Sequence, residues 1–549
     1  MLGKLIDKVL YDEEEGLEHK GKHKDLGEEI KEEIIEEIEE VKEAITRERK
    51  FSLASFLPPL FLFLLAFGVR MAFMLMNDPQ SPGYGWYGDV YHHWQIAYLT
   101  KAIGLNHGFL RLWDLKGMEY FWGLMHPLVL MALFTLTTSV NIVIARLLSI
   151  VCGSFVVVFI YLLMKRYFNS GVAFVVGLWA ALFSVALFSD TLGMQEQLGL
   201  FLLLAGMLAW PGWGWLTGLL WAMASMVRSE YWLFAVALVL AAFFDRKKKT
   251  TESKVIMLVV YLVPILIYMK YMLGHTGNAV FPIYWNYMAS VKGEWFTNLD
   301  TPLTSIQVIG QWFGRGLFGL GILGSLITFF KRPKHFLFFL LGFFNVTFIG
   351  FMFGFGAYIH GFFERFFVDR LLAFPYLFLG ILVILFFLYW LPRASGKLGK
   401  VVSFFGVLIF LALLAGSQLA WGLIMHYFQM AQAPYKTELQ IAEFVAEKDQ
   451  GGKVVFVSDR PALTYALVKN YNLEGERIVS DMYDPFYYAD GSETVQELDQ
   501  EVIDWMEREG VKTIVHGGKE EYNDLFGRRI DRFKFLGNKI NISVYEFLR

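Results

Sequence analysis

Apolar residues occur in long runs from about residue 53 to residue 421, whereas charged residues collect at the two ends of the chain. A helix needs about 20 apolar residues to cross the roughly 30 Å hydrocarbon core of a bilayer. The runs therefore predict a polytopic α-helical membrane protein with about eleven transmembrane helices. The predicted spans are residues 53–76, 142–164, 171–189, 192–210, 212–227, 231–244, 255–273, 307–330, 335–353, 371–391 and 401–421.

Basic residues predict the orientation of these helices, because Lys and Arg in short loops remain on the cytoplasmic side. The spans place every basic cluster inside if the apolar stretch 121–138 is a re-entrant or interfacial segment. The N-terminus is then cytoplasmic, and the long first loop, residues 77–141, faces outside. The basic clusters are Arg47, Arg49 and Lys50; Lys165 and Arg166; Arg246 to Lys249; Lys331, Arg332 and Lys334; and Arg393, Lys397 and Lys400.

The composition changes at both ends, which predicts three domains. Residues 1–50 are charged, with helical spacing of Ile and Val after residue 28, and form a predicted cytoplasmic amphipathic segment. Residues 51–425 are the predicted transmembrane domain, and residues 426–549 are a predicted soluble domain outside the cytoplasm. In the soluble domain, strand-like and helix-like runs alternate, which is typical of an α/β fold. The strands are predicted at 453–458, 477–480, 512–516 and 540–547, and the helices at 438–447 and 494–509.

Composition narrows the chemistry further. The chain is 56% hydrophobic and 18% charged, and its net charge of −3 arises from acids concentrated at the ends, so nucleic acid is disfavoured as a partner. The single cysteine, Cys152, lies in an apolar run and is a predicted core residue, because one thiol forms no internal disulfide. No glycine-rich phosphate loop follows the predicted strands, so no nucleotide site is expected in the soluble domain.

Ionisable residues at the outer ends of the predicted spans are the candidate functional groups, because charges inside a membrane are costly and usually functional or paired. Guanidinium groups there would suit a lipid phosphate, which they bind in a bidentate manner. Alternatively, each arginine pairs with an acid or extends to the interface. The cations in the outer halves of helices are Arg70, Arg146, Lys270 and Arg315, and the charged residues in external loops include Asp89, Asp190, Glu196, Arg228, Glu364, Arg365 and Arg370.

Several short motifs follow one another between residues 53 and 391, and their order resembles that of the GT-C superfamily of membrane glycosyltransferases. This superfamily includes protein mannosyltransferases and aminoarabinose transferases, and it uses sugars linked to polyprenyl phosphates. The motifs are Asp89-Val90-Tyr91, His126-Pro127-Leu128, Ala145-Arg146-Leu147, Lys165-Arg166-Tyr167-Phe168, Glu364-Arg365-Phe366-Phe367 and Phe374-Pro375.

The resemblance implies an inverting hexosyl or pentosyl transferase of the cell membrane, in which Asp89 matches the first-loop acid and would be the catalytic base. Family members often have a second acid directly after the first, whereas this chain has Val90. The other residues implied or placed near the substrate are Tyr91, His92, His93, Asp190, Glu196, Arg228, Arg315, Glu364, Arg365 and Arg370. Trp86 and Trp94 flank Asp89 and are candidates for stacking against a sugar.

Glu196, with Asp190 before it, matches the second-loop acid that helps to hold a divalent metal in related oligosaccharyltransferases. No tight Asp-x-Asp pair is present, so a divalent metal stays open and no other cofactor is implied. The Trp-Trp-Asp-Tyr-Gly motif of those enzymes is absent, which favours transfer of a monosaccharide over a whole oligosaccharide. A zinc site is a further alternative, but no helical ligand spacing is present and packing is favoured. Its ligands would come from His92, His93, His107 and His126 with Asp89 or Glu119.

The expected partners are a dolichyl- or polyprenyl-phosphate sugar, membrane lipids, and a glycan, protein or lipid acceptor. The end segments rich in Lys and Glu favour an archaeal source and hence a dolichyl lipid in protein glycosylation or cell-envelope assembly. The competing hypothesis is a transporter or a lipid-glycan flippase, which predicts internal repeats and charges near the membrane midplane. No repeat is evident, and the charges lie toward one face.

Overall fold

The structure is a computed structural model that describes residues 53–77, 88–103, 123–210, 212–244, 251–284, 323, 373–419, 437–457, 460–479, 500–517 and 526–548. The chain divides into two compact units, Met1–Leu60 and Phe61–Arg549. The predicted amphipathic segment at residues 28–50 and the predicted spans 307–330 and 335–353, apart from Leu323, lie outside the described residues.

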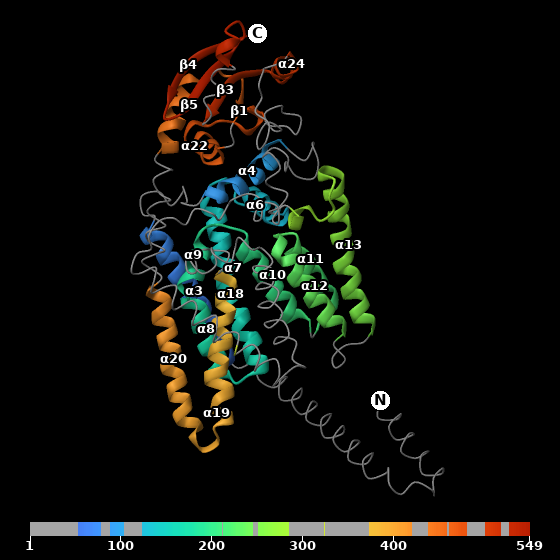
Figure 1. The fold of residues 1–549 in the computed structure, drawn as a ribbon, viewed down its shortest axis with the longest axis vertical. Helices are drawn as coiled ribbons and strands as arrows, with labels where there is room; N and C mark the ends of the chain where they lie inside the picture. The colour runs from blue at the N-terminus through green and yellow to red at the C-terminus, as the bar shows by residue number, and fades with distance from the viewer. Residues whose placement is uncertain are drawn as a thin grey trace, which may run out of the picture. The chain divides into compact units, whose positions relative to one another are not determined.

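The chain from residue 53 to residue 419 is helical in its described parts (Figure 1). Five of the described helices are long and apolar enough to cross a membrane, at Phe56–Met76, Val143–Tyr167, Thr251–Gly274, Leu377–Ala394 and Gly396–Gly416. The protein is therefore a membrane protein. The helices are α3 (Leu53–Asn77), α4 (Gly88–Ile103), α6 (Met125–Leu136), α7 (Val143–Tyr167), α8 (Ser170–Leu182), α9 (Ser184–Thr191), α10 (Glu196–Ala209), α11 (Gly214–Ser225), α12 (Ser229–Phe244), α13 (Thr251–Thr276), α18 (Ala373–Leu385), α19 (Leu391–Ala394) and α20 (Gly399–Leu419).

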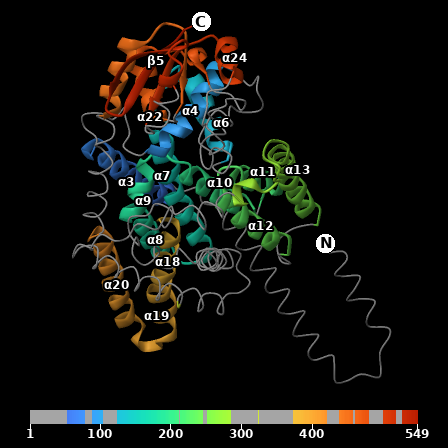
Figure 2. The same ribbon diagram turned by 45° about the horizontal axis from the view of Figure 1, so that its top comes forward.

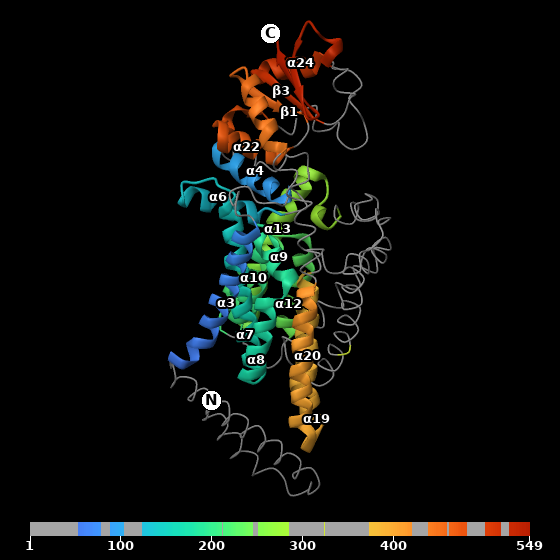
Figure 3. The same ribbon diagram turned by 90° about the vertical axis from the view of Figure 1, so that its left-hand side faces the viewer.

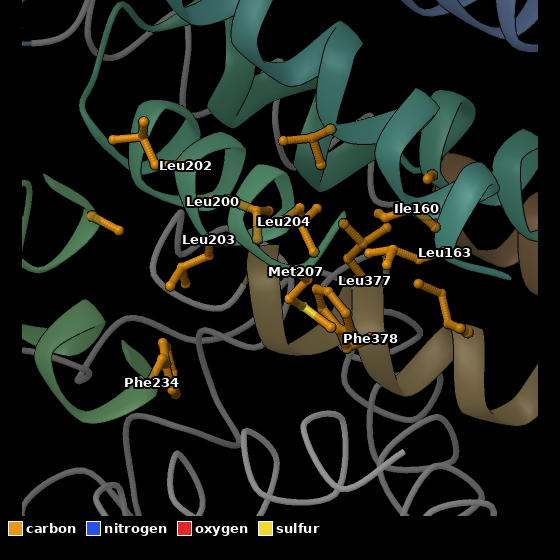
Figure 4. Packing of buried hydrophobic residues seen from close by; sticks show 14 of the residues in the cluster. Ile160, Leu163, Leu200, Leu202, Leu203, Leu204, Met207, Phe234, Leu377 and Phe378 are labelled. Atoms are coloured by element: carbon orange, nitrogen blue, oxygen red, sulfur yellow. The ribbon is translucent and has the colours of Figure 1, made fainter. Parts of the chain in front are cut away.

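The helices α7, α8, α10 and α18 meet around one buried apolar core. Figure 4 shows Ile160 and Leu163 of α7 near Leu203 and Leu204 of α10 and Leu377 of α18. The helices α18 and α20 lie side by side (Figure 1) and are joined through a π-helical turn at Phe386–Trp390 and α19. Figure 3 shows α19 at the end of α20. Cys152 is buried in α7, as expected for a core residue.

Buried indoles anchor the core by donating to main-chain oxygens of neighbouring helices. Trp179 of α8 donates through Nε1 to Leu377 O at 3.0 Å, and Trp221 of α11 donates to Leu203 O at 3.1 Å. Each bond satisfies a polar atom that would otherwise be buried without a partner.

The predicted spans between residues 171 and 210 differ from the observed helices, and the count of about eleven spans is not confirmed. The predicted span 171–189 is divided into α8 and α9 at Phe183, whose ψ of 115° is extended. The predicted span 192–210 begins only at Glu196, because Gly193 has a φ of +86° that no helix accommodates. The sequence period alone could not reveal these breaks, since both sides of each break are apolar.

Two helices lie within the predicted first loop. α6 has 12 residues, which corresponds to a length of about 18 Å and is too short to cross a bilayer core alone. The expectation of a re-entrant or interfacial segment at residues 121–138 stays a prediction. α4 was not predicted, because its mixture of His, Tyr, Lys and Thr gives no clear apolar period.

The C-terminal residues form a five-stranded sheet in the order β2-β1-β3-β5-β4. The strands are β1 (Lys453–Phe456), β2 (Ile478–Val479), β3 (Val511–Gly517), β4 (Phe533–Lys539) and β5 (Ile542–Phe547). β1 is parallel to β2 and β3, whereas β5 is antiparallel to β3 and β4. Ile540 and Asn541 both have positive φ, which is the geometry of a two-residue hairpin turn.

The helices of the sheet region include residues 437–448, α22 (Pro461–Tyr471) and α24 (Gln500–Glu509), and the predicted α/β character is thereby confirmed. The predicted strands near 453, 477 and 512 are present, and the segment 540–547 is one arm of a hairpin whose other arm was not predicted. α22 was also not predicted. It lies against α4 (Figure 2), so these two helices, far apart in sequence, share a buried face.

Candidate active site between α4, α7 and α10

Asp89 occupies the first turn of α4 and is half-buried. The residues that follow it, Val90, Tyr91 and Trp94, are fully buried. An aspartate in a first turn lies close to the unsatisfied N–H groups of the helix. The buried neighbours hold the start of α4 in place, while Asp89 keeps part of its surface exposed.

The turn between α9 and α10 passes close to the start of α4. A Cβ atom at position 193 would lie 2.9 Å from Val90 Cγ2 and 3.1 Å from Arg146 Cγ, so only glycine fits there. The positive φ of Gly193 adds a second reason for glycine at this position. The two segments therefore meet at Val90 and Gly193. Asp89 is the residue before Val90, and Glu196 lies three residues after Gly193.

Arg146 and Ser149 of α7 hold this turn through its main chain. Arg146 Nε donates to Thr191 O at 3.0 Å, and Ser149 Oγ donates to Met194 O at 3.4 Å. Both side chains are buried. A charge-assisted bond from a buried guanidinium is among the stronger contacts in a protein interior, so α7 fixes the path of residues 191–194.

Glu196 begins α10 and pairs with Arg228, which precedes α12. Arg228 Nη1 donates to Glu196 Oε1 at 2.9 Å, and the two side chains are 7% and 13% exposed. Tyr231 donates through its hydroxyl to Glu196 O at 2.6 Å. The structure therefore brings together two residues that the sequence places 32 positions apart and that were both predicted near the substrate.

Asp190 and Arg70 form a second, more deeply buried pair. Arg70 Nε donates to Asp190 Oδ2 at 2.5 Å, and the side chains are 1% and 3% exposed. Arg70 also donates to Ala66 O and Ala181 O. Asp190 was predicted in an external loop but lies within helix α9. Arg70 pairs with an acid, which was the alternative to binding of a lipid phosphate by this arginine.

Other buried polar groups lie near these pairs. His126 and Gln195 are fully buried, and within the described residues none of their side-chain nitrogen or oxygen atoms has a hydrogen-bond partner. The rings of His93 and His126 meet edge to face with centroids 4.8 Å apart. Polar atoms buried without partners cost free energy, so they are more common at functional sites than in ordinary cores. The sequence signal for Gln195 was the polar Gln195-Glu196-Gln197 triplet between two apolar runs.

Two aromatic residues have surroundings that differ from the expectation. Trp94 is fully buried, stacks on Tyr98 at 4.9 Å and donates to Val140 O at 2.6 Å, so it is not available to stack on a sugar. Tyr91 is fully buried with its ring 5.3 Å from that of Tyr465. Sequence alone did not separate these residues from exposed ones, because aromatic residues are common in both settings. Trp86, Arg315, Glu364, Arg365 and Arg370 lie outside the described residues.

Among the residues that the structure describes, no three His, Cys, Asp or Glu side chains gather closely enough to hold a metal ion. His92 is partly buried, and His107 and Glu119, the other proposed zinc ligands, are outside the described ranges. The charged groups that the described residues place on the two meeting segments include the carboxylates of Asp89 and Glu196, and Glu196 pairs with Arg228.

Comparisons of the whole chain give matches to solved structures only. No protein-family model matches the sequence, and no curated protein matches it. The chain is similar to ArnT from Cupriavidus metallidurans bound to undecaprenyl phosphate, with a TM-score of 0.51 and 14% identity over 90% of this chain and 98% of that one.

A second similar structure is the oligosaccharyltransferase of Archaeoglobus fulgidus in complex with Zn and sulfate. Its TM-score is 0.49 at 13% identity, over 88% of this chain and 72% of that one. The first similarity spans nearly the full length of both chains. The chain therefore shares the fold of that ArnT structure, which agrees with the resemblance indicated by its motifs.

Proposed function

We propose that this protein is an inverting glycosyltransferase that moves a monosaccharide from a dolichyl- or polyprenyl-phosphate donor to an acceptor hydroxyl on the external face of the membrane. The observation that carries the proposal is the contact between the Asp89 segment and the turn at Gly193, which leads to the Glu196–Arg228 pair, in a chain that shares the fold of ArnT. The polyprenyl phosphate is supported by the similar ArnT structure, which was solved with undecaprenyl phosphate bound.

Asp89 is the proposed general base. A carboxylate accepts the proton of the acceptor hydroxyl while the hydroxyl oxygen attacks the anomeric carbon. The bond between the anomeric carbon and the phosphate oxygen breaks, and the polyprenyl phosphate leaves with the electron pair. Attack opposite to the leaving group inverts the anomeric centre. The partial exposure of Asp89, beside fully buried neighbours, suits a group that must reach a substrate.

Arg228 is the proposed contact for the departing phosphate. Arg228 donates through Nη1 to Glu196 Oε1, and this bond orients a guanidinium group, which is the side chain best suited to bind phosphate oxygens. A fixed cation lowers the energy of a transition state in which negative charge grows on phosphate. The proposed role of Glu196 is therefore to position Arg228. His92, Arg315, Glu364, Arg365 and Arg370 remain proposed substrate contacts of the same site. Tyr91 and His93 are fully buried and are proposed to support the site without touching the substrate, and Asp190 is proposed to act through Arg70.

The proposed location of the site is the external side. The contact between α22 and α4 supports a soluble domain on the same side of the membrane as the Asp89 segment, in agreement with the orientation predicted from the basic loops. The proposed domains are residues 1–50, 51–425 and 426–549, with the last outside the cytoplasm. The acceptor is proposed to be a glycan, a protein or a lipid.

The test is sugar transfer in proteoliposomes from a panel of radiolabelled dolichyl- and undecaprenyl-phosphate monosaccharides. Asp89→Asn is expected to lower the turnover of the accepted donor by about 10²- to 10⁴-fold, because the general base is lost. Binding of undecaprenyl phosphate alone is expected to be unchanged. Glu252→Gln is the matched control, because Glu252 is also an acid in the first turn of a helix, α13, and is exposed.

Retention of full turnover by Asp89→Asn would remove Asp89 from the mechanism. If no donor is turned over and undecaprenyl phosphate does not bind, the glycosyltransferase proposal fails, and lipid-glycan flipping should be measured in the same vesicles.

A further inference from the structure

Tyr465 of the soluble domain is buried among residues of the candidate active site. The side chain is 1% exposed and belongs to the same apolar cluster as Val90, Ala145 and Met194. Its ring lies 5.3 Å from the ring of Tyr91 and meets that of Trp94 edge to face at 4.8 Å. Tyr465 therefore packs on α4 two and five residues after Asp89.

The hydroxyl of Tyr465 reaches a different helix. It accepts a bond from the N–H of Ile142 at 3.2 Å and donates to Asn141 Oδ1 at 3.3 Å. Asn141 Oδ1 also accepts from the N–H of Val143 at 3.0 Å, and Ile142 is the N-cap of α7. The ring thus contacts α4, and the hydroxyl bonds to the beginning of α7.

These two helices carry the two halves of the candidate site. α4 bears Asp89, and α7 bears Arg146, one turn after Ile142, which holds the turn leading to Glu196. We propose that Tyr465 is a positioning residue that fixes α4 and α7 relative to each other and thereby sets the distance between Asp89 and the Glu196–Arg228 pair. This inference rests on the proposed function. It assigns the soluble domain a part in building the active site.

The C-terminal region also contacts the other end of α4. Tyr98 donates through its hydroxyl to Leu473 O at 3.4 Å, and Leu99 is buried in the soluble-domain cluster with Leu463 and Leu467. A Cβ at position 475 would lie 2.6 Å from Ala102 Cβ, so glycine permits the close approach. The contacted residues of α4, at positions 91, 94, 98 and 102, recur at helical spacing and form one face.

Tyr465 has too little exposed surface to touch a substrate, so its effect must pass through α4 and α7. Tyr465→Phe removes two hydrogen bonds and retains the ring packing, which makes the substitution mild for folding. Tyr471→Phe is the matched control, because Tyr471 lies on the same helix and is 41% exposed.

The experiment compares wild type, Tyr465→Phe and Tyr471→Phe as full chains in proteoliposomes. We expect Tyr465→Phe to lower kcat for sugar transfer by about 10- to 100-fold, with KM for the donor within about twofold, because misplaced reacting groups slow the chemical step. Hydrogen exchange should become faster in residues 88–103 and 141–146 and stay unchanged in β1 and β3. Tyr471→Phe should match wild type in every measurement.

Gly475→Ala tests the same inference from the other end of α4, since the added methyl group presses on Ala102. It should show the same loss of kcat with KM preserved. The inference is overturned if exchange in α4 is unaffected by Tyr465→Phe, or if exchange rises while both variants retain the kcat of the control. If wild type transfers no sugar, the proposed function fails by itself, and the exchange comparison still decides whether Tyr465 holds α4.

Discussion

Arginine–carboxylate pairs occur in both the helical region and the C-terminal sheet region, but their surroundings differ. Arg70 and Asp190 are 1% and 3% exposed, and Arg70 bonds in addition to two main-chain oxygens. Arg532 and Glu507 pair at 2.8 Å with side chains that are 30% and 40% exposed. Glu438 and Arg460, at 2.7 Å, are intermediate, with exposed fractions of 11% and 30%. The same two chemical groups thus occur in three environments within one chain.

The difference matters because the cost of leaving a charge unpaired depends on its solvation. An exposed pair exchanges its partner for water and contributes about 0–1 kcal/mol. A buried pair has no water to replace a lost partner, so breaking it costs about 3–5 kcal/mol. The Arg70–Asp190 pair therefore determines how α3 and α9 assemble, whereas the Arg532–Glu507 pair contributes little to folding. The predictions below test this order.

Arg70→Met is expected to have the largest effect on stability. It leaves the Asp190 carboxylate buried without its cation and should lower the free energy of unfolding by about 3–5 kcal/mol. Unfolding by increasing mole fractions of dodecyl sulfate in maltoside micelles measures the change. The double variant Arg70→Met, Asp190→Leu should recover most of the loss, because no isolated charge remains. A single variant within about 1 kcal/mol of wild type would contradict the buried-pair account.

Glu438→Gln is expected to have an intermediate effect that depends on pH. Burial raises the pKa of Glu438, and the Arg460 guanidinium opposes this shift only in part. The folded chain then keeps a proton that the unfolded chain has lost, so wild-type stability falls as pH rises from the usual carboxyl pKa through the raised one. Glutamine does not ionise, so the stability of Glu438→Gln lacks this dependence on pH.

The unfolding free energy of Glu438→Gln relative to wild type should therefore rise between pH 4.5 and pH 7.5. Calorimetric unfolding of both full chains at the two pH values measures the difference. Glu443→Gln, on the same helix and with an exposed carboxylate, is the control and should show no such rise. A constant difference between Glu438→Gln and wild type would show that the pKa is not raised.

Arg532→Met is expected to have the smallest effect. Its partner Glu507 is exposed to water, so the free energy of unfolding should change by no more than about 0.5 kcal/mol. The change should shrink further in 1 M salt, which screens exposed charges. Chemical denaturation at low and high salt measures both quantities. A loss comparable to that of Arg70→Met would remove the distinction between the two regions.

Much of the fold could be predicted from local pattern. The long apolar runs at α3, α7, α13 and α20 predicted helices within a few residues of those observed, and β-rich runs predicted β1 and β3. The breaks at Phe183 and Gly193 could not be predicted, because they depend on which neighbouring helix approaches. α22 was missed for a related reason, since its apolar face is completed by α4 from a distant part of the chain.

In the candidate site, too, some features could be predicted from the sequence and others depended on tertiary contacts. Asp89, Glu196 and Arg228 were selected as charged residues at the ends of apolar runs, a choice that required no structure. The pairing of Glu196 with Arg228, and of Asp190 with Arg70, was not predictable, because every external acid had several candidate arginines. Trp94 was expected to face a sugar and is instead packed against Tyr98 and Tyr465.

The sequence by itself determined that this is a membrane protein with a C-terminal region of strands and helices, because hydropathy and strand or helix periodicity are properties of neighbouring residues. The order of its short motifs indicated a resemblance with which the fold shared with ArnT agrees. Only the tertiary structure decided which charges neutralise one another, which aromatic rings are buried, and that Tyr465 joins α4 to α7. These properties depend on contacts between distant residues, such as Tyr465 and Asn141, which are 324 positions apart, and no local pattern encodes such a contact.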